Sequence, residues 1–200
     1  TYELYVSIAD VAHYVAPDTA LDQEAYARST SVYFPDRAIP MLPEDLSNGI
    51  CSLKPHEDRL TKTVCIELNP KGDVIRSRFF NSVIRSHERM TYTDVRRILI
   101  DHDAECLARY RTLVSEFKRM EELALLLYER RRARGNLDFD LPEAEIILDL
   151  QGSPENIIRA ERNVAHRIIE EFMIAANEAV ARHLTEKDFP TLYRVHEGPD

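Results

Sequence analysis

The feature that most constrains the fold is a pair of strand-like segments joined by a tight turn, between residues 60 and 85. Residues 60–68 alternate around Val64 and Ile66, and this period of two is typical of a β-strand. Residues 69–72 read Asn-Pro-Lys-Gly, which are turn-forming residues. Residues 74–85 then return as the partner strand, so the sequence predicts a β-hairpin.

Two long helices are predicted after these strands. Apolar residues recur at helical spacing over residues 104–132 and again over residues 155–184. The first helix ends in a basic run, residues 130–134, followed by Gly135, as is typical of a helix C-terminus. Pro154 fits the first turn of the second helix. The predicted apolar stripe of that helix consists of Ile158, Ile169, Phe172, Met173, Ala176 and Val180.

Shorter elements complete an α/β domain, which we predict to be a single unit over residues 1–200. Leu4, Val6 and Ile8 share one face of a strand at residues 3–10. The other predicted elements are a helix at residues 22–29, a strand at residues 30–34, a helix from an N-cap at Thr93 to Leu99, and a strand or hairpin within residues 139–150.

The composition is ordinary for a globular protein, but the net charge is −9. Nucleic-acid-binding proteins usually carry a basic patch, so this charge alone argues against RNA, unless a basic groove is local and flanking modules capture the RNA. Apolar runs such as residues 123–128 are too short to span a bilayer, and no signal peptide is recognisable. Cys51, Cys65 and Cys106 lack metal-ligand spacing, which favours reduced thiols and a cytoplasmic location.

The residues alone leave each candidate site with two interpretations. The basic run at residues 130–134 could contact phosphate or could simply end a helix. Neighbouring glutamates, as in Glu121-Glu122 and Glu170-Glu171, diverge by about 100° on a helix and are not expected to converge on one metal ion. Glu170 stays open because it lies beside the apolar stripe. Four aromatic residues could plug the core or stack on bases. They are Tyr33, Phe34, Tyr92 and Phe139.

Six segments carry longer motifs in a fixed order. They are residues 6–15, 30–43 with 46–53, 83–92, 134–139, 162–177 and 193–197. The first contains Ile8-Ala9-Asp10, and the fourth reads Arg134-Gly135-Asn136-Leu137-Asp138-Phe139. Together they resemble the RNB family of exoribonucleases (ribonuclease II and ribonuclease R), and they are closer to its ribonuclease R branch. The resemblance implies the RNB catalytic-domain fold, a mixed sheet packed with long helices.

The resemblance also implies an activity. Members of this family hydrolyse single-stranded RNA processively from its 3′ end and release nucleoside 5′-monophosphates. The RNA enters a channel too narrow for a duplex, and Mg²⁺ held by aspartates activates water for in-line attack. Cold-shock and S1-type RNA-binding domains are expected to flank the catalytic domain.

The chain departs from the family pattern at both ends. The family's metal ligands lie in a D-x-D-D-A motif that would precede Thr1, and its catalytic arginine would follow Asp200. We therefore expect an internal part of a catalytic domain, with neither catalytic nor metal-ligating residues among these 200. Asp10 is the nearest retained carboxylate, and its role is either a metal contact or a structural one.

The residues that do match the family pattern belong to the substrate-holding part of the site. Tyr33 matches a tyrosine that stacks on the terminal base, and Phe139 matches an aromatic residue that clamps the terminal nucleotides from the other side. Tyr92 and Glu170 match positions near the last nucleotides. A glutamate there can accept a hydrogen bond from a ribose hydroxyl.

Two other functions compete with the exoribonuclease. In one, the aspartate motif has been lost and the domain is a non-catalytic RNA-binding scaffold. In the other, the chain is an unrelated acidic interaction domain, which would make six ordered motif matches a coincidence.

Overall fold

An antiparallel sheet forms the centre of the computed structural model, which describes residues 1–136, 144–148, 154–159 and 162–193. Its strands are β1 (Tyr2–Ala9), β4 (Asp58–Leu68) and β5 (Val74–Arg85), and β4 lies between the other two. The register sets Leu4 opposite Ile66. The predicted α/β class, the strand near the N-terminus and the hairpin at residues 60–85 are confirmed.

The middle strand β4 is buried on both faces, for two different reasons. On one face, Ile66 and Leu68 are apolar and fully enclosed. On the other face, Thr61 Oγ1 and Thr63 Oγ1 lie 2.7 and 2.6 Å from Ser82 Oγ of β5. Because buried hydroxyls require hydrogen-bond partners, these contacts satisfy the polar side of the strand and tie it to β5.

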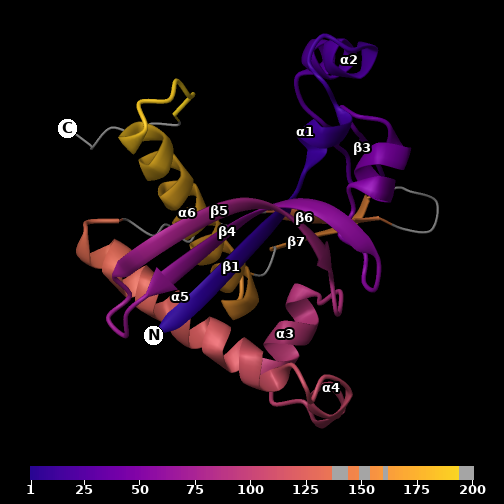
Figure 1. Ribbon diagram of the computed structural model, residues 1–200. Coiled ribbons are helices and arrows are strands. Elements are labelled where there is room, and N and C mark those ends of the chain that lie inside the picture. The colour runs from indigo at the N-terminus through magenta and orange to yellow at the C-terminus, as the bar shows by residue number, and fades with distance from the viewer. Residues whose placement is uncertain (137–143, 149–153, 160–161, 194–200) are drawn as a thin grey trace.

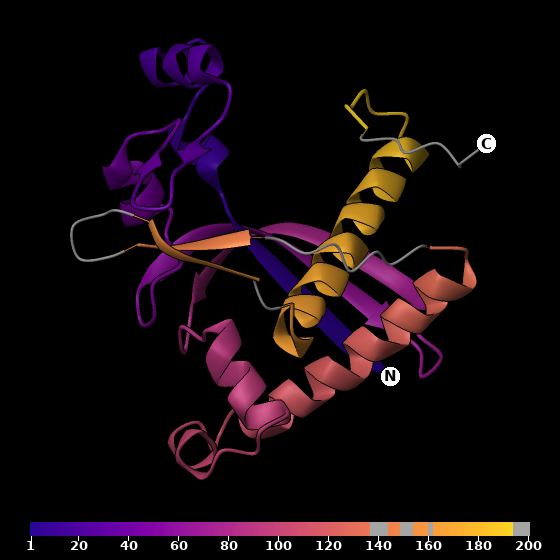
Figure 2. The same cartoon turned by 180° about the vertical axis from the view of Figure 1, so that it is seen from behind.

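Three helices cover the apolar face of the sheet, as the two opposite views in Figures 1 and 2 show. They are α3 (Tyr92–Leu99), α5 (Val114–Ala133) and α6 (Val164–Glu186). Each contributes buried apolar side chains to a shared core, among them Ile98, Phe117, Leu123, Ile168 and Phe172. Burial of side chains of this size contributes roughly 1.5–3 kcal/mol each, so this layer holds the helices in place on the sheet.

The predicted single helix over residues 104–132 is wrong, because the chain turns between two helices. Helix α4 (Ala104–Arg109) ends at Tyr110, whose φ of −106° and ψ of 25° leave the helical region. The Leu113 N–H donates to Tyr110 O at 2.8 Å, and α5 begins at the next residue. Tyr110 and Phe117 are buried on either side of this turn. The apolar spacing therefore continues across the break and conceals it in the sequence.

The predicted helix start at Pro154 is also wrong. Strand β7 (Pro154–Arg159) pairs antiparallel with β6 (Ala144–Leu148), with Ile157 opposite Ile146. Pro at the first position of a strand costs no ladder hydrogen bond, and isoleucines favour strands. Helix α6 begins instead after Asn163, which caps it.

The apolar stripe of α6 also differs from the prediction. Ile158 lies in β7, and Ile169 and Met173 are exposed, whereas Phe172 and Ala176 are buried as expected. The buried face is completed by Ala165, Ile168, Glu171 and Ala179.

The short elements between β1 and β4 form a lobe beyond the end of β1 (Figure 1). They are α1 (Val11–Tyr14), α2 (Ala20–Arg28), β2 (Val32–Tyr33), β3 (Ala38–Ile39) and the π-helical turn η1 (Asp45–Ile50). The predicted helix at residues 22–29 and strand at 30–34 correspond to α2 and β2.

Helix α3 begins two residues earlier than predicted. The Asp94 N–H donates to Thr91 Oγ1 at 3.0 Å, so Thr91 is the N-cap and Thr93 lies inside the helix. Within the described part of the chain, none of the helices combines the length and the apolar character that a membrane span requires.

Gly72 in the β4–β5 turn provides a test of how closely the hairpin packs on α5. Both Gly72 and Gly135 have positive φ, at 77° and 95°. A Cβ at Gly72 would lie 2.8 Å from Arg130 Cδ, whereas among the described residues no atom beyond the two chain neighbours lies within 4 Å of a Cβ at Gly135. Gly135→Ala should cost about 1–2 kcal/mol from backbone strain. Gly72→Ala should cost about 1–3 kcal/mol more from the clash. Urea unfolding of both variants measures the difference, and equal losses would contradict the close packing.

Candidate substrate-holding site

Tyr33 lies on the lobe and projects into solvent. It is the last residue of β2, opposite Ala38 of β3, and its side chain is 80% exposed. The short hairpin is closed by the Phe34 N–H, which donates to Arg37 O at 2.7 Å. Because Tyr33 contributes no burial to the core, the core-plug interpretation is excluded for this residue.

Tyr92 is the first residue of α3, and its ring stacks on an imidazole from α6. The ring centroids of Tyr92 and His166 lie 3.9 Å apart with an interplanar angle of 24°. His166 is itself held at the start of α6, where its Nδ1 accepts from the Asn163 N–H at 3.3 Å. Tyr92 as a whole residue is still about half exposed (45%). Tyr92 is thus positioned by α6 and remains accessible.

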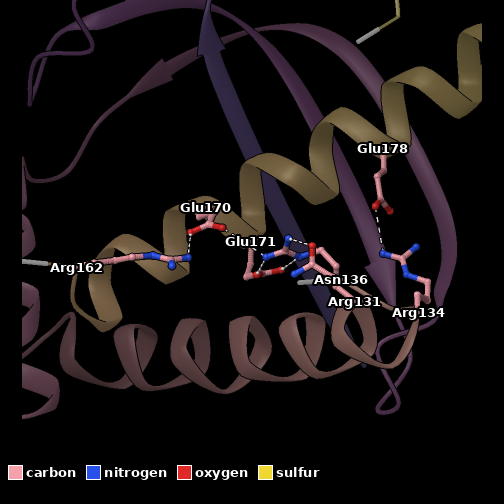
Figure 3. A network of polar contacts seen from close by, with 7 residues as sticks. All are labelled: Arg131, Arg134, Asn136, Arg162, Glu170, Glu171 and Glu178. Atoms are coloured by element: carbon pink, nitrogen blue, oxygen red, sulfur yellow. Dashed lines mark hydrogen bonds and ion pairs between the residues drawn. The ribbon is translucent and has the colours of Figure 1, made fainter. Parts of the chain in front are cut away.

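Glu170 lies one helical turn after His166, on the same side of α6. Arg162 Nη2 donates to its Oε2 at 2.8 Å, and Arg131 Nη2 lies 3.4 Å from its Oε1 (Figure 3). The side chain is 35% exposed. Tyr92 and Glu170 are therefore brought to the same end of α6, although 78 residues separate them in the sequence.

Behind Glu170 lies the buried carboxylate of Glu171, which is only 2% exposed. Arg131, near the C-terminus of α5, meets it with two nitrogens: Nη2 lies 2.5 Å from Oε1 and Nε lies 3.3 Å from Oε2. Arg131 Nη1 also donates to Asn136 Oδ1 at 3.0 Å (Figure 3). The adjacent glutamates, which were not expected to converge on one ion, thus share one guanidinium.

The other basic residues near the end of α5 are paired in the same way. Arg130 Nη2 lies 2.6 Å from Asp73 Oδ1, and Arg134 Nη2 lies 3.1 Å from Glu178 Oε1. The side-chain hydrogen bond from Asn69 and the charge of Arg130 lower the pKa of the Asp73 carboxyl. The basic run therefore ends the helix and pairs with acids of the chain, which favours the structural interpretation over the phosphate one.

Phe139 lies outside the described residues, so its predicted role remains a prediction. The lobe that carries Tyr33 lies apart from the N-terminal end of α6, where Tyr92 of α3 stacks on His166 and where Glu170 lies (Figure 1). Three of the four predicted residues are thus placed, and two of these three are brought together.

The described residues do not fit a magnesium site. Within them, no group of three or more His, Cys, Asp or Glu side chains could hold a metal ion. Asp10 is buried at the end of β1, and Lys62 Nζ lies 3.2 Å from its Oδ2. Magnesium prefers several oxygen ligands, and the ammonium already neutralises this carboxylate, which favours a structural role for Asp10.

Sequence reasoning missed Arg131, Glu171 and His166 as parts of this site. A signal for Glu171 was available: it lies between Ile168 and Phe172 on the apolar face of α6, which begins at Val164. A carboxylate on a buried face needs a cation, which would have directed attention to the basic run of α5. The misplaced helix start hid that signal.

The chain belongs to the RNB family, because the RNB domain model matches residues 1–200. It is 48% identical to ribonuclease R of Aquifex aeolicus (strain VF5) over 199 residues, which covers 100% of this chain and 28% of that protein. It is 42% identical to ribonuclease R of Escherichia coli (strain K12), covering 99% of this chain and 24% of that protein.

A solved structure shows the same fold. Mycoplasma genitalium RNase R in complex with ribose methylated single-stranded RNA superposes with a TM-score of 0.90 and 34% identity, covering 98% of this chain and 30% of that one. In the two sequence comparisons, the chain spans about a quarter of the length of the curated relatives.

Removing the buried carboxylate tests how strongly the Arg131–Glu171 pair holds α5 to α6. Glu171→Ala should lower the free energy of unfolding by about 3–5 kcal/mol, because it leaves the Arg131 charge uncompensated inside the protein. Glu178→Ala breaks the exposed pair with Arg134 on the same two helices and should cost less than about 1 kcal/mol. Chemical denaturation measures both, and similar small losses would show that the buried pair contributes no more than a surface one.

Proposed function

We propose that this chain forms the RNA-clamping part of the active-site channel of a processive 3′→5′ exoribonuclease that converts single-stranded RNA to nucleoside 5′-monophosphates. The observation that carries this proposal is identity of 42–48% with ribonuclease R proteins over essentially the whole chain. Mycoplasma genitalium RNase R, which has the same fold, was solved in complex with single-stranded RNA, and this supports RNA as the substrate here.

The geometry suits a sequence-independent hold on RNA. Exposed Tyr33 offers a free ring face, and stacking on a base is worth about 1–3 kcal/mol whichever base it is. Tyr92 and Glu170 lie at the same end of α6, where a carboxylate can accept a hydrogen bond from a ribose hydroxyl. The chain carries a net charge of −9 and the basic run of α5 is paired internally, so stacking and ribose contacts dominate its share of RNA binding.

The chemical step is assigned to residues outside these 200. Mg²⁺ held there by carboxylates would supply an activated water and stabilise the leaving oxygen. In the full-length protein, we propose flanking cold-shock and S1-type domains for RNA capture, and a cytoplasmic location. Cys51, Cys65 and Cys106 are all free thiols, which suits a reducing compartment.

The alternative function is a non-catalytic RNA-binding scaffold with the same fold. The two functions differ in the sequence that precedes Thr1. A D-x-D-D-A motif about ten residues before β1 supports the enzyme, and its loss supports the scaffold.

Truncation of Tyr33 tests the clamp in the full-length protein. Tyr33→Ala should lengthen the shortest RNA product left after digestion, because the 3′-terminal base loses its stacking partner. Tyr26→Ala is the matched control, since Tyr26 is a similarly exposed tyrosine (87%) on α2 of the same lobe. Denaturing gels with labelled oligonucleotides resolve the end products. An unchanged end product for Tyr33→Ala would remove this residue from the clamp.

The isolated chain of 200 residues should not hydrolyse RNA. Its described residues lack a carboxylate cluster for Mg²⁺, so water would not be activated even where RNA binds. Release of nucleoside monophosphates is followed chromatographically with Mg²⁺ present, and the full-length protein is the positive control. Mg²⁺-dependent release by the isolated chain would contradict the assignment of the metal site to residues outside it.

A further inference from the structure

Four charged side chains form a network of ion pairs at the junction of α5 and α6 (Figure 3). Arg131 contacts both Glu171 and Glu170, and Arg162 contacts the other oxygen of Glu170. Two guanidinium groups thus face two carboxylates. Glu170 and Glu171 are adjacent in the sequence, and Arg131 contacts both carboxylates. Its positive charge therefore reduces the electrostatic repulsion between them.

Arg131 is the member of this network with the least freedom to move. Its side chain is 17% exposed, and its partner Glu171 is 2% exposed. The two nitrogens on Glu171 form the forked geometry that a guanidinium favours with a carboxylate, and Asn136 accepts from the third nitrogen. Buried Glu171 and half-buried Asn136 therefore hold the Arg131 guanidinium on all three of its nitrogens.

Glu170 takes its orientation from this fixed group. Arg131 approaches one carboxylate oxygen and Arg162 the other, so rotation of the carboxylate would break a contact on one side. An ionised carboxylate has about four acceptor positions, and these two contacts leave room for a further donor. The side chain is one-third exposed (35%), so such a donor can arrive from outside the protein.

We infer that Arg131 is a positioning residue: anchored by buried Glu171, it holds the Glu170 carboxylate in the orientation that accepts a hydrogen bond from the 2′-hydroxyl of a nucleotide near the RNA 3′ end. The inference rests on the proposed function for the identity of the ligand. Arg131 itself does not touch the RNA. Selectivity for ribose over deoxyribose therefore depends partly on Arg131 of α5, which acts on the RNA only through Glu170.

The test compares two kinds of substrate with the full-length protein. One is an all-ribose oligonucleotide, and the others carry a single 2′-deoxynucleotide at each of the last positions in turn. Arg131→Lys keeps the charge but loses the fork. It should reduce the preference for ribose at one of these positions about tenfold, as loss of a hydrogen bond to a charged group would. Degradation of the matching deoxy substrate should change by less than about twofold, because that substrate offers no hydroxyl to Glu170.

Arg134→Lys is the matched control. Like Arg131, Arg134 lies at the C-terminal end of α5 and pairs with a glutamate of α6, but that glutamate is Glu178 and not Glu170. This control should leave the ribose preference unchanged. If Arg131→Lys folds poorly, Arg131→Met combined with Glu171→Met removes both buried charges together, which proteins often tolerate. This double variant should lose the same preference.

A double-mutant cycle with Glu170→Gln separates positioning from general damage. Arg131→Lys should have no further effect on ribose preference once Glu170 is changed, because both act through one carboxylate. Equal losses on both substrates, or additive effects in the cycle, would overturn the inference.

Binding measurements keep the two proposals apart. Fluorescence anisotropy with the same oligonucleotides in EDTA reports ribose preference without cleavage. A protein that discriminates ribose through Glu170 and Arg131 but releases no nucleotides would refute the nuclease and retain the positioning role. If the full-length protein degrades RNA and the Arg131→Lys variant keeps its ribose preference, the positioning role is refuted and the nuclease is retained.

Discussion

The pairing of Arg131 with Glu171 is the interaction on which the candidate site most depends. A carboxylate that is 2% exposed cannot remain charged inside a protein without a partner, and the partner comes from another helix. The pair therefore joins the C-terminal end of α5 to the second turn of α6. It also accounts for the arrangement around it, since Glu170 is adjacent in sequence and meets the same guanidinium. A structural ion pair and a candidate ligand-binding group are thus parts of one network.

The rest of the fold makes that junction possible. The sheet is apolar on the side that faces α3, α5 and α6, and its other side is satisfied by hydroxyl contacts between β4 and β5. Because three helices pack on one face of the sheet, residues from distant segments of the chain meet where the ends of these helices lie close together. Tyr92 reaches His166 from α3 in this way, and Arg131 reaches Glu171 from α5. Tyr33 is positioned differently, on a short hairpin of the lobe that leaves its ring exposed.

The success of prediction differed between strands and helices for a physical reason. The hairpin at residues 60–85 was predictable because alternation has a period of two and its turn residues are distinctive. The helical period could not reveal the turn between α4 and α5, because Tyr110 and Phe117 are buried on either side of it. Residues 154–159 were assigned to a helix because Pro154 suits a first turn, but pairing with β6 decided the outcome. Of the candidate site, the exposed aromatic residue and Glu170 were found from motifs, while the network that supports Glu170 was not.

The family, the α/β class, the central hairpin and the candidate residues Tyr33, Tyr92 and Glu170 could be predicted without a structure, because they depend on local patterns and on motif order. Which carboxylate is buried, and which cation meets it, became apparent from the folded chain. The side chains of Arg131 and Glu171 are 40 residues apart and lie on different helices, so their pairing depends on how α5 and α6 pack against the sheet. Such packing results from burial over the whole apolar face, which no local segment encodes.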